Sequence, residues 1–266
     1  MAGNQENVIS RYADGCWEQR KGSIIREGPV RLHVNGSELV TLMCTPEHLD
    51  WLALGFLRSE GIITGLNDVR LYKVCPGETC VDIWLRRADV ILPSTRTITS
   101  GCGGGVTFAD LAATAVPVGD ELRVTAPQIC KLMIALIEAG TLYRQSRGVH
   151  TAALARGEQL IRVVEDVARH NCIDKLWGRC LLEGIPTQAA ILLTTGRISS
   201  EMLYKAARMG VEAVASRTSP TSLSVALASN WNLTLIGYVR HDSLNVYAGQ
   251  GRLAADDTGR DNAHER

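Results

Sequence analysis

The chain has no excess of charge of either sign, because 28 lysine and arginine residues are matched by 28 aspartate and glutamate residues. Such a chain has no bulk attraction to nucleic acid or to an anionic membrane surface, so we expect neither as a partner. It also has no apolar run as long as the roughly 18 residues of a membrane-spanning helix. The polar first residues lack the apolar segment of a signal peptide. We therefore expect a cytoplasmic protein.

Several common ligand-site patterns are also missing. Neither a Walker motif nor a glycine fingerprint for a dinucleotide is present, which argues against ATP and NAD. The eight cysteines are scattered, unlike the disulfide framework of a secreted protein. Cys75 and Cys80 could be half of a zinc site, but no second cysteine pair is placed to complete four ligands. We therefore interpret this pair as part of a hairpin turn.

One cysteine has unusual surroundings. Cys102 lies between Gly101 and three consecutive glycines, whereas Cys44, Cys130, Cys172 and Cys180 lie on apolar runs and are expected in the core. Glycine lets the backbone approach a ligand closely, and successive N–H groups can form an anion-binding nest. Such a nest would stabilise the thiolate, which is the nucleophilic form of cysteine. From this segment alone, a reactive sulfur and a tight turn that happens to hold a cysteine remain open.

The first half of the chain predicts a β-rich part. Residues 1–22 are expected to form a frayed lead-in. Strands at 30–34 and 38–44 flank Asn35-Gly36, a strong hairpin signal. Thr45 and Pro46 then predict the start of a helix, as the N-cap and the first helical residue. A second strand pair is expected at 69–74 and 80–86, followed by the principal loop over 93–107.

The second half predicts alternating strands and helices, which indicate α/β layers with partly parallel strands. The expected strands are 149–155, 160–165, 189–194, 211–215, 233–239 and 244–247. The expected helices are 127–143, 169–183, 199–209 and 221–230. We assign an N-terminal β-rich subdomain to 24–125, ending in the loop that holds Cys102, and an α/β domain to 126–250. Residues 1–23 and 252–266 are predicted to be flexible tails.

Polar residues gather where the predicted strands of this α/β domain end. His170 follows one strand, Arg197 and Ser199 follow another, a third corner spans 216–221, and Arg240 follows the last long strand. Ligands of α/β folds bind at the carboxyl ends of strands, where helix starts and arginine bind phosphate. Ordinary helix capping explains any single corner. Several corners on one sheet edge favour a site for a large phosphorylated ligand.

In combination, these segments resemble the FdhD/NarQ family, the formate dehydrogenase accessory sulfurtransferases. The resemblance spans roughly residues 24–250, with many motifs in the family's order. The matching residues are 27–30, 34–36, 44–47, 54–57, 60–63, 100–103, 148–152, 165–167, 169–171, 174–175, 195–197, 201–202 and 235–237.

The resemblance implies a fold, a reaction and partners. The fold would be a cytidine-deaminase-like layered α/β domain with an N-terminal β-rich α+β part, assembled as a homodimer. The chain would accept a persulfide from a cysteine desulfurase on Cys102. It would then pass the sulfur to the molybdenum or tungsten of the bis-guanine-dinucleotide cofactor of formate dehydrogenase. The residues assigned to cofactor binding, from the resemblance and the polar corners together, are Tyr238, Val239, Arg240, His241, Asp242, Ser243, Arg197, Ser199 and His170.

The chain also departs from the family. A second cysteine often follows the first by three residues, but Gly105 stands there, and Ala168 replaces a usual glycine. No glutamate follows His150 and no deaminase cysteine motif is present, so we expect no catalytic zinc. A non-catalytic chaperone for the molybdenum cofactor therefore remains the alternative to a sulfurtransferase, and a zinc-dependent deaminase is disfavoured.

Overall fold

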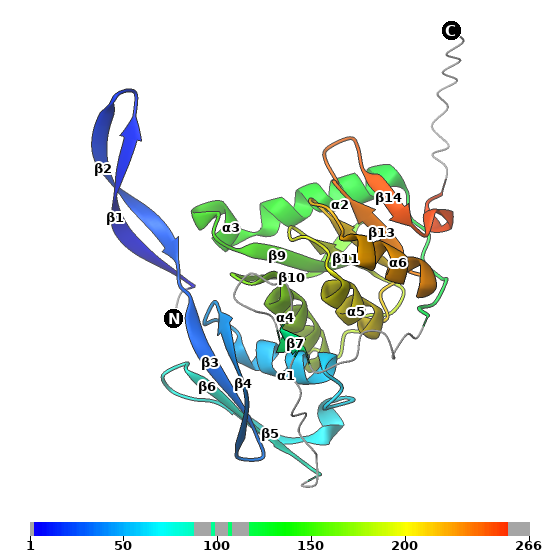
Figure 1. Ribbon diagram of the computed structural model, residues 1–266, viewed down its shortest axis with the longest axis horizontal. Coiled ribbons are helices and arrows are strands. Elements are labelled where there is room, and N and C mark those ends of the chain that lie inside the picture. The colour runs from blue at the N-terminus through cyan, green and yellow to red at the C-terminus, as the bar shows by residue number, and fades with distance from the viewer. Residues whose placement is uncertain (1–2, 88–96, 99–105, 108–116, 255–266) are drawn as a thin grey trace.

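The computed structural model describes residues 3–87, 97–98, 106–107 and 117–254. It is a mixed α/β structure in which a four-stranded sheet and a six-stranded sheet lie on either side of two packed helices (Figure 1). A long two-stranded hairpin projects from the N-terminal side. In the described part of the chain, every helix is too short or too polar to cross a membrane.

The four-stranded sheet has the order β4-β3-β6-β5. Its strands are β3 (Gly28–Val34), β4 (Ser37–Cys44), β5 (Val69–Val74) and β6 (Cys80–Leu85), and the short helix η1 (Leu66–Asp68) precedes β5. Asn35 and Gly36 both have positive φ, as the predicted hairpin turn requires. Both predicted strand pairs are confirmed. The inner face packs on α1 (Leu49–Ser59), whose apolar residues share one core with the strands.

The start of α1 differs from the prediction. The N-cap is His48 rather than Thr45. Thr45 is fully buried, and its hydroxyl oxygen accepts a hydrogen bond from the Val167 N–H. A residue with good capping chemistry is used here for a contact that is distant in the sequence.

The six-stranded sheet has the order β10-β9-β11-β12-β13-β14. Its strands are β9 (His150–Arg156), β10 (Gln159–Asp166), β11 (Ile191–Thr194), β12 (Ala213–Ser216), β13 (Thr234–Gly237) and β14 (Asn245–Ala248), which confirms the strands predicted there. The helix α2 (Ala126–Ala139) packs on one face, and α4 (Arg169–Leu182), α5 (Ser200–Met209) and α6 (Ser222–Asn230) pack on the other. The helix predicted at 127–143 is interrupted at Gly140, where α3 (Thr141–Ser146) begins.

The helices α1 and α4 join the two sheets and pack unusually closely. A Cβ on Gly55 would lie 1.8 Å from the Asp174 carbonyl oxygen, and one on Gly178 would lie 1.9 Å from that of Trp51. Only glycine fits at such backbone contacts. These two glycines therefore set the distance between the N-terminal sheet and the larger one.

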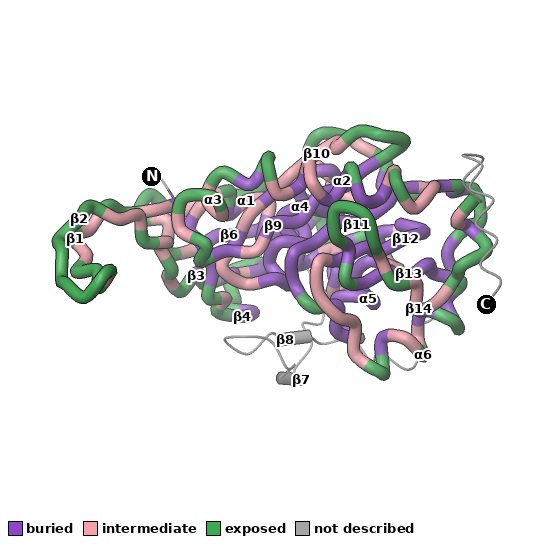
Figure 2. Tube along the Cα trace, turned by 90° about the horizontal axis from the view of Figure 1, so that it is seen from above, coloured by how far each residue is buried: buried purple, intermediate pink, exposed green. Residues whose placement is uncertain are grey.

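The N-terminal lead-in is ordered as strands, so the frayed segment predicted over 1–22 is wrong. β1 (Asn4–Ala13) and β2 (Cys16–Ile25) pair along their full length around a turn at Asp14 and Gly15, both with positive φ. The hairpin is largely exposed, whereas the six-stranded sheet holds the most buried part of the chain (Figure 2). Strand pairing is the main source of order here, because the hairpin has almost no core side.

The C-terminal region packs further than predicted. The short helix η2 (Gln250–Arg252) ends at Arg252, whose side chain is buried between Asp120 and Glu212. Val124 bridges to Leu253. The flexible tail predicted from 252 therefore does not include Arg252 or Leu253, and 255–266 lie outside the described residues.

Candidate functional site

The carboxyl ends of four strands meet at one edge of the six-stranded sheet. β10, β11, β12 and β13 run in the same direction, because β9 is antiparallel to both β10 and β11 and the next pairs are parallel. These strands end at Asp166, Thr194, Ser216 and Gly237. The prediction that the polar corners share one edge is thus confirmed, and ligands of α/β folds bind at such an edge.

A cationic groove of about 460 Å³ opens beside this edge. It is lined by Tyr143, Arg147, Gly148, Val149, His150, Thr195, Arg217, Thr218 and Arg240. Three of these residues are arginines, and none of the described lining residues carries a carboxylate. Guanidinium groups bind phosphate oxygens with paired hydrogen bonds. The groove therefore suits an anionic ligand, and a phosphorylated one above all.

Arg240 is held in place by the backbone of two corners. Its guanidinium donates to the carbonyl oxygens of Arg217 at 2.5 Å and Val239 at 3.0 Å. Its own N–H donates to the Ser243 carbonyl oxygen at 2.8 Å. The guanidinium also lies 5.9 Å from the centre of the Tyr238 ring. The exposed ring and the fixed cation could contact a planar base and a phosphate respectively.

The other assigned residues of this segment divide between interior and surface. Tyr238 is exposed and has a left-handed backbone with φ 52°. Val239 is buried, and its N–H donates to the Ser216 carbonyl oxygen. His241, Asp242 and Ser243 are exposed in the turn that leads to β14. Of the residues assigned from sequence, Arg240 is the one that lines the groove.

Arg147, Arg217 and His150 line the groove but were not assigned to it from sequence. Arg147 ends α3 with a left-handed backbone, and its guanidinium lies 4.9 Å from the centre of the Tyr143 ring. Burial lowers the pKa of His150, and the Arg169 charge adds to this effect, so its imidazole is neutral at neutral pH. The sequence did contain a signal for each of them. Arg147 directly precedes the matched motif at 148–152, and His150 lies within it. Arg217 directly follows the last residue of β12.

Arg197, Ser199 and His170 do not line the groove. Arg197 is exposed, whereas Ser199 is buried and caps α5 by accepting a hydrogen bond from the Met202 N–H at 3.4 Å. This cap was predicted. The Nε2 of His170 lies 3.3 Å from the Ser199 hydroxyl and 3.1 Å from a Glu201 carboxylate oxygen. A role for these three residues in ligand binding stays a prediction.

His170 is neutral in the folded protein. Burial lowers its pKa to about 2, and the positive charges of Lys205 and Arg169 add to the effect. At physiological pH the imidazole is therefore uncharged where it faces the Ser199 hydroxyl and the Glu201 carboxylate. Through its contact with Ser199, His170 can support the turn between β11 and α5 from inside the protein.

A buried polar network fixes this edge to the N-terminal sheet. Lys175 Nζ lies 2.7 Å from an Asp166 carboxylate oxygen and donates to the Thr45 carbonyl oxygen at 2.9 Å. Lys205 Nζ lies 2.5 Å from the Asp174 carboxylate, which also accepts from the Ser59 hydroxyl at 2.6 Å. Buried charges persist only when paired and hydrogen-bonded. Much of the motif over 165–175 thus holds the two sheets together.

Cys102 and most of the loop predicted over 93–107 lie outside the described residues. The strands that flank Cys102 in the sequence, β7 (Thr97–Ile98) and β8 (Val106–Thr107), pair in antiparallel fashion. Burial raises the pKa of Cys44 to about 12 and of Cys180 to about 11, and it also raises the pKa of Cys130 and Cys172. The prediction that these four cysteines are core residues is confirmed. None of these four is suited to act as a thiolate.

Comparisons with known proteins show the family of this chain. The sequence model of the FdhD/NarQ family matches residues 25–254. Relatives named sulfur carrier protein FdhD include that of Staphylococcus haemolyticus, 35% identical over 94% of this chain and 97% of the relative. That of Bacillus pumilus is 37% identical over the same shares of the two chains.

A solved structure has a similar fold. The crystal structure described as that of a formate dehydrogenase accessory protein from Desulfotalea psychrophila superposes with a TM-score of 0.79 at 26% identity. The superposition covers 95% of this chain and all of that one. The protein is an α/β protein with a cationic groove at the carboxyl edge of its larger sheet. It belongs to the FdhD/NarQ family.

Proposed function

We propose that the protein is a sulfur carrier that serves formate dehydrogenase. The Cys102 thiolate attacks the outer sulfur of a persulfide on a cysteine desulfurase. A new S–S bond forms as Cys102–S–SH, and the donor cysteine leaves as a thiolate. The observation that carries this proposal is the family match across 25–254, which includes the glycine-rich segment around Cys102.

The second half of the proposed reaction delivers the sulfur to the metal of a molybdenum or tungsten bis-guanine-dinucleotide cofactor, which is cargo here. The sulfane sulfur must gain two electrons to become sulfide. Gly105 occupies the place of the second loop cysteine, so we assign these electrons to a thiol reductant outside this segment. The Cys102 thiol is regenerated when its S–S bond breaks.

The cationic groove is the proposed binding site for the cargo. Its volume of about 460 Å³ is that of a site for one small ligand. We therefore place one guanine-nucleotide portion there, with phosphates near Arg147, Arg217 and Arg240. The assigned segment from Tyr238 to Ser243 borders the groove through Arg240, and Tyr238 offers the stacking surface.

The remaining proposals concern fold, partners and location. We propose that the larger sheet with helices on both faces is the cytidine-deaminase-like layer, without catalytic zinc, since Thr151 follows His150. Its support is an antiparallel hairpin followed by successive parallel strands with intervening helices. We further propose a cytoplasmic homodimer that contacts a desulfurase and formate dehydrogenase. The alternative is a chaperone that binds the cofactor without carrying sulfur.

Cys102→Ser tests the proposal. We expect the variant to gain no sulfur during incubation with a cysteine desulfurase and cysteine, as followed by intact-protein mass spectrometry. It should also fail to restore formate dehydrogenase activity in a deletion strain, because the carrier thiol is gone. Cys16→Ser, which changes an exposed cysteine of the β1–β2 hairpin, should behave as wild type in both assays.

The two assays separate the proposals. If Cys102→Ser restores formate dehydrogenase activity, the sulfur carrier mechanism is wrong and the chaperone is favoured. If wild-type protein gains sulfur at a cysteine other than Cys102, the assignment of the carrier residue is wrong.

A further inference from the structure

A second constellation of reactive side chains lies on the outer face of the four-stranded sheet. The strands β3 and β6 pair in parallel, with His33 opposite Asp82. Because side chains alternate along a strand, Val81 and Ile83 point into the core, and Cys80 and Asp82 point outward. The register of these strands therefore places His33, Cys80 and Asp82 together on the face away from the core.

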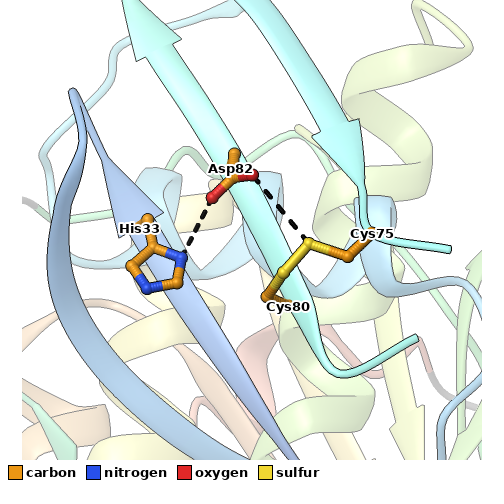
Figure 3. The surroundings of a disulfide bond; sticks show 4 residues. All are labelled: His33, Cys75, Cys80 and Asp82. Atoms are coloured by element: carbon orange, nitrogen blue, oxygen red, sulfur yellow. Dashed lines mark hydrogen bonds and ion pairs between the residues drawn. A yellow bond between two sulfur atoms is a disulfide. The ribbon is translucent and has the colours of Figure 1, made fainter. Parts of the chain in front are cut away.

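Cys75 completes this group across the β5–β6 turn. Its N–H donates to the Cys80 carbonyl oxygen, the two Cα atoms are 5.4 Å apart, and the two sulfurs form a disulfide. Figure 3 shows Asp82 between the disulfide and His33. Its carboxylate oxygens lie 3.0 Å from His33 Nδ1 and 3.9 Å from Cys75 Sγ. The cysteines were predicted to lie at a hairpin turn, and this is confirmed.

The distances suit a shared cation. The ligand atoms of His33, Cys80 and Asp82 all lie within 4.8 Å of one another. In a tetrahedral zinc site with ordinary bond lengths, the ligand atoms lie roughly 3.3–3.8 Å apart. Side-chain rotations that move these ligand atoms by about an ångström would therefore bring them to zinc-binding distances. The His33 Nδ1 atom is buried, and its contact with Asp82 is not aligned as a hydrogen bond. A coordinated cation would satisfy both groups.

The donor set selects the metal. When the disulfide is reduced, the four side chains offer two thiolates, one imidazole and one carboxylate. Magnesium and calcium prefer oxygen ligands, so two thiolates argue against them. A tetrahedral set of two sulfur ligands, one nitrogen and one oxygen is suited to zinc. All four residues are half-buried, so an ion can enter without opening the core.

We propose that the reduced protein binds one zinc ion through Cys75, Cys80, His33 and Asp82, and that disulfide formation releases it. The site stands apart from the sulfur carrier function, because none of its residues lines the groove. The missing half of the zinc site comes from neighbouring strands rather than from a second cysteine pair.

The steps balance with named reactants. A dithiol reduces the Cys75–Cys80 bond, becomes a cyclic disulfide itself and leaves two thiols on the protein. Zinc binding displaces the two thiol protons to water. In the reverse direction, a low-molecular-weight disulfide accepts two electrons from the two metal-bound thiolates and leaves as two thiolates. The protein disulfide forms, and Zn²⁺ departs with its charge unchanged.

Zinc competition measures the site. Full-length protein is reduced with a dithiol, desalted without oxygen and titrated with Zn²⁺ against a chromophoric chelator. We expect one tightly bound zinc per reduced chain and none at this site in the oxidised protein. Co²⁺ in place of zinc should give the visible bands of a tetrahedral ion and the charge-transfer bands of thiolate ligation.

Single variants identify the ligands. Cys75→Ser, Cys80→Ser, His33→Gln and Asp82→Asn should each weaken zinc binding by at least about tenfold, the smallest effect usual even for residues behind the ligands. Asp82→Asn keeps the shape of the side chain, and circular dichroism checks the fold of every variant. Cys16→Ser and Cys102→Ser are the matched controls and should bind zinc as wild type does.

Three results would overturn the proposal. The first is a reduced protein that binds no zinc, and the second is binding that disappears in either control variant. The third is unchanged affinity in both His33→Gln and Asp82→Asn, which would leave a simple dithiol. Sulfur loading of Cys102 is measured on the wild-type protein and on the four ligand variants, so a failure of the zinc site is distinguishable from a failure of the proposed carrier function.

Discussion

Residues at the carboxyl edge of the larger sheet have two kinds of role: some can contact a ligand, and others support the backbone of the edge. Arg240 is exposed, and its guanidinium is oriented by the backbone of the neighbouring corner. His170 follows β10, which ends at the same edge, but is buried and neutral. The chemistry of a side chain thus identified candidates at this edge, while burial decided which of them can contact a ligand.

Arg240→Ala tests the groove. Loss of a charge-assisted contact typically costs about 1.5–3 kcal/mol, which is roughly ten- to a hundredfold in affinity. We expect GDP binding, measured by calorimetry, to weaken by that factor, while sulfur loading of Cys102 stays unchanged. Arg70→Ala, an exposed arginine on β5, is the matched control. Normal GDP affinity with failed sulfur loading would instead place Arg240 at the donor-docking surface.

His170→Gln tests the neutral buried imidazole. An unfolded histidine titrates near pKa 6.5, whereas the folded pKa of His170 is about 2. Below about pH 6.5 the unfolded chain binds a proton that the folded protein does not, so the free energy of unfolding falls by up to roughly 1.4 kcal/mol per pH unit. Urea unfolding between pH 7 and pH 4 should show a shallower fall in the variant.

The exposed His241 supplies the control for this pH dependence. His241→Gln changes a side chain that is exposed in the folded protein and should leave the pH slope of wild type unchanged. Equal slopes for wild type and His170→Gln would contradict a neutral buried His170.

Among the elements, the crossing of α1 and α4 depends on two glycines that no local pattern distinguishes. The strands and most helices follow from periodicity, capping residues and turns. Ser199 and Thr221, for example, are N-caps at the two positions where helices were predicted to start. Gly55 and Gly178 lie inside helices, where glycine is unfavourable, and their presence is explained only by the facing backbone.

Gly178→Ala tests this crossing. The added Cβ would lie 1.9 Å from the Trp51 carbonyl oxygen, so one helix must move and the shared core must repack. We expect the free energy of unfolding in urea to fall by about 3 kcal/mol or more, at the upper end of overpacking effects. Gly65→Ala is the control, since a Cβ at Gly65 would meet no described atom within 4 Å and its φ is extended. Similar small effects in both variants would show that the helices can separate freely.

For the molecule as a whole, the projecting β1–β2 hairpin is notable because it exposes large apolar side chains to solvent. An isolated two-stranded hairpin is only marginally stable in water. Its exposed apolar residues include Val8, Tyr12 and Trp17, and the Tyr12 and Trp17 rings lie 5.3 Å apart. We therefore propose this surface as the contact to test for the proposed homodimer.

The double variant Tyr12→Ser with Trp17→Ser tests that role. If the hairpin contributes to the dimer contact, the variant should shift toward monomer in light scattering coupled to size exclusion. The double variant Leu71→Ser with Tyr72→Ser changes exposed apolar residues on β5 and should leave the mass unchanged. A hairpin variant that keeps a wild-type dimer would exclude the hairpin from the contact.

The amino-acid sequence was sufficient to predict the order of most strands and helices, the turn at Asn35-Gly36, the buried cysteines and the shared edge of the polar corners. These features depend on local backbone preference, on periodic burial and on the rule that parallel strands end together. Long-range packing was needed to show that Thr45 joins two sheets, that Arg147 and Arg217 line one groove with Arg240, and that Asp82 lies between His33 and the Cys75–Cys80 disulfide. Each of these contacts joins residues from separate elements, so strand register and helix packing must be known before the contact can be seen.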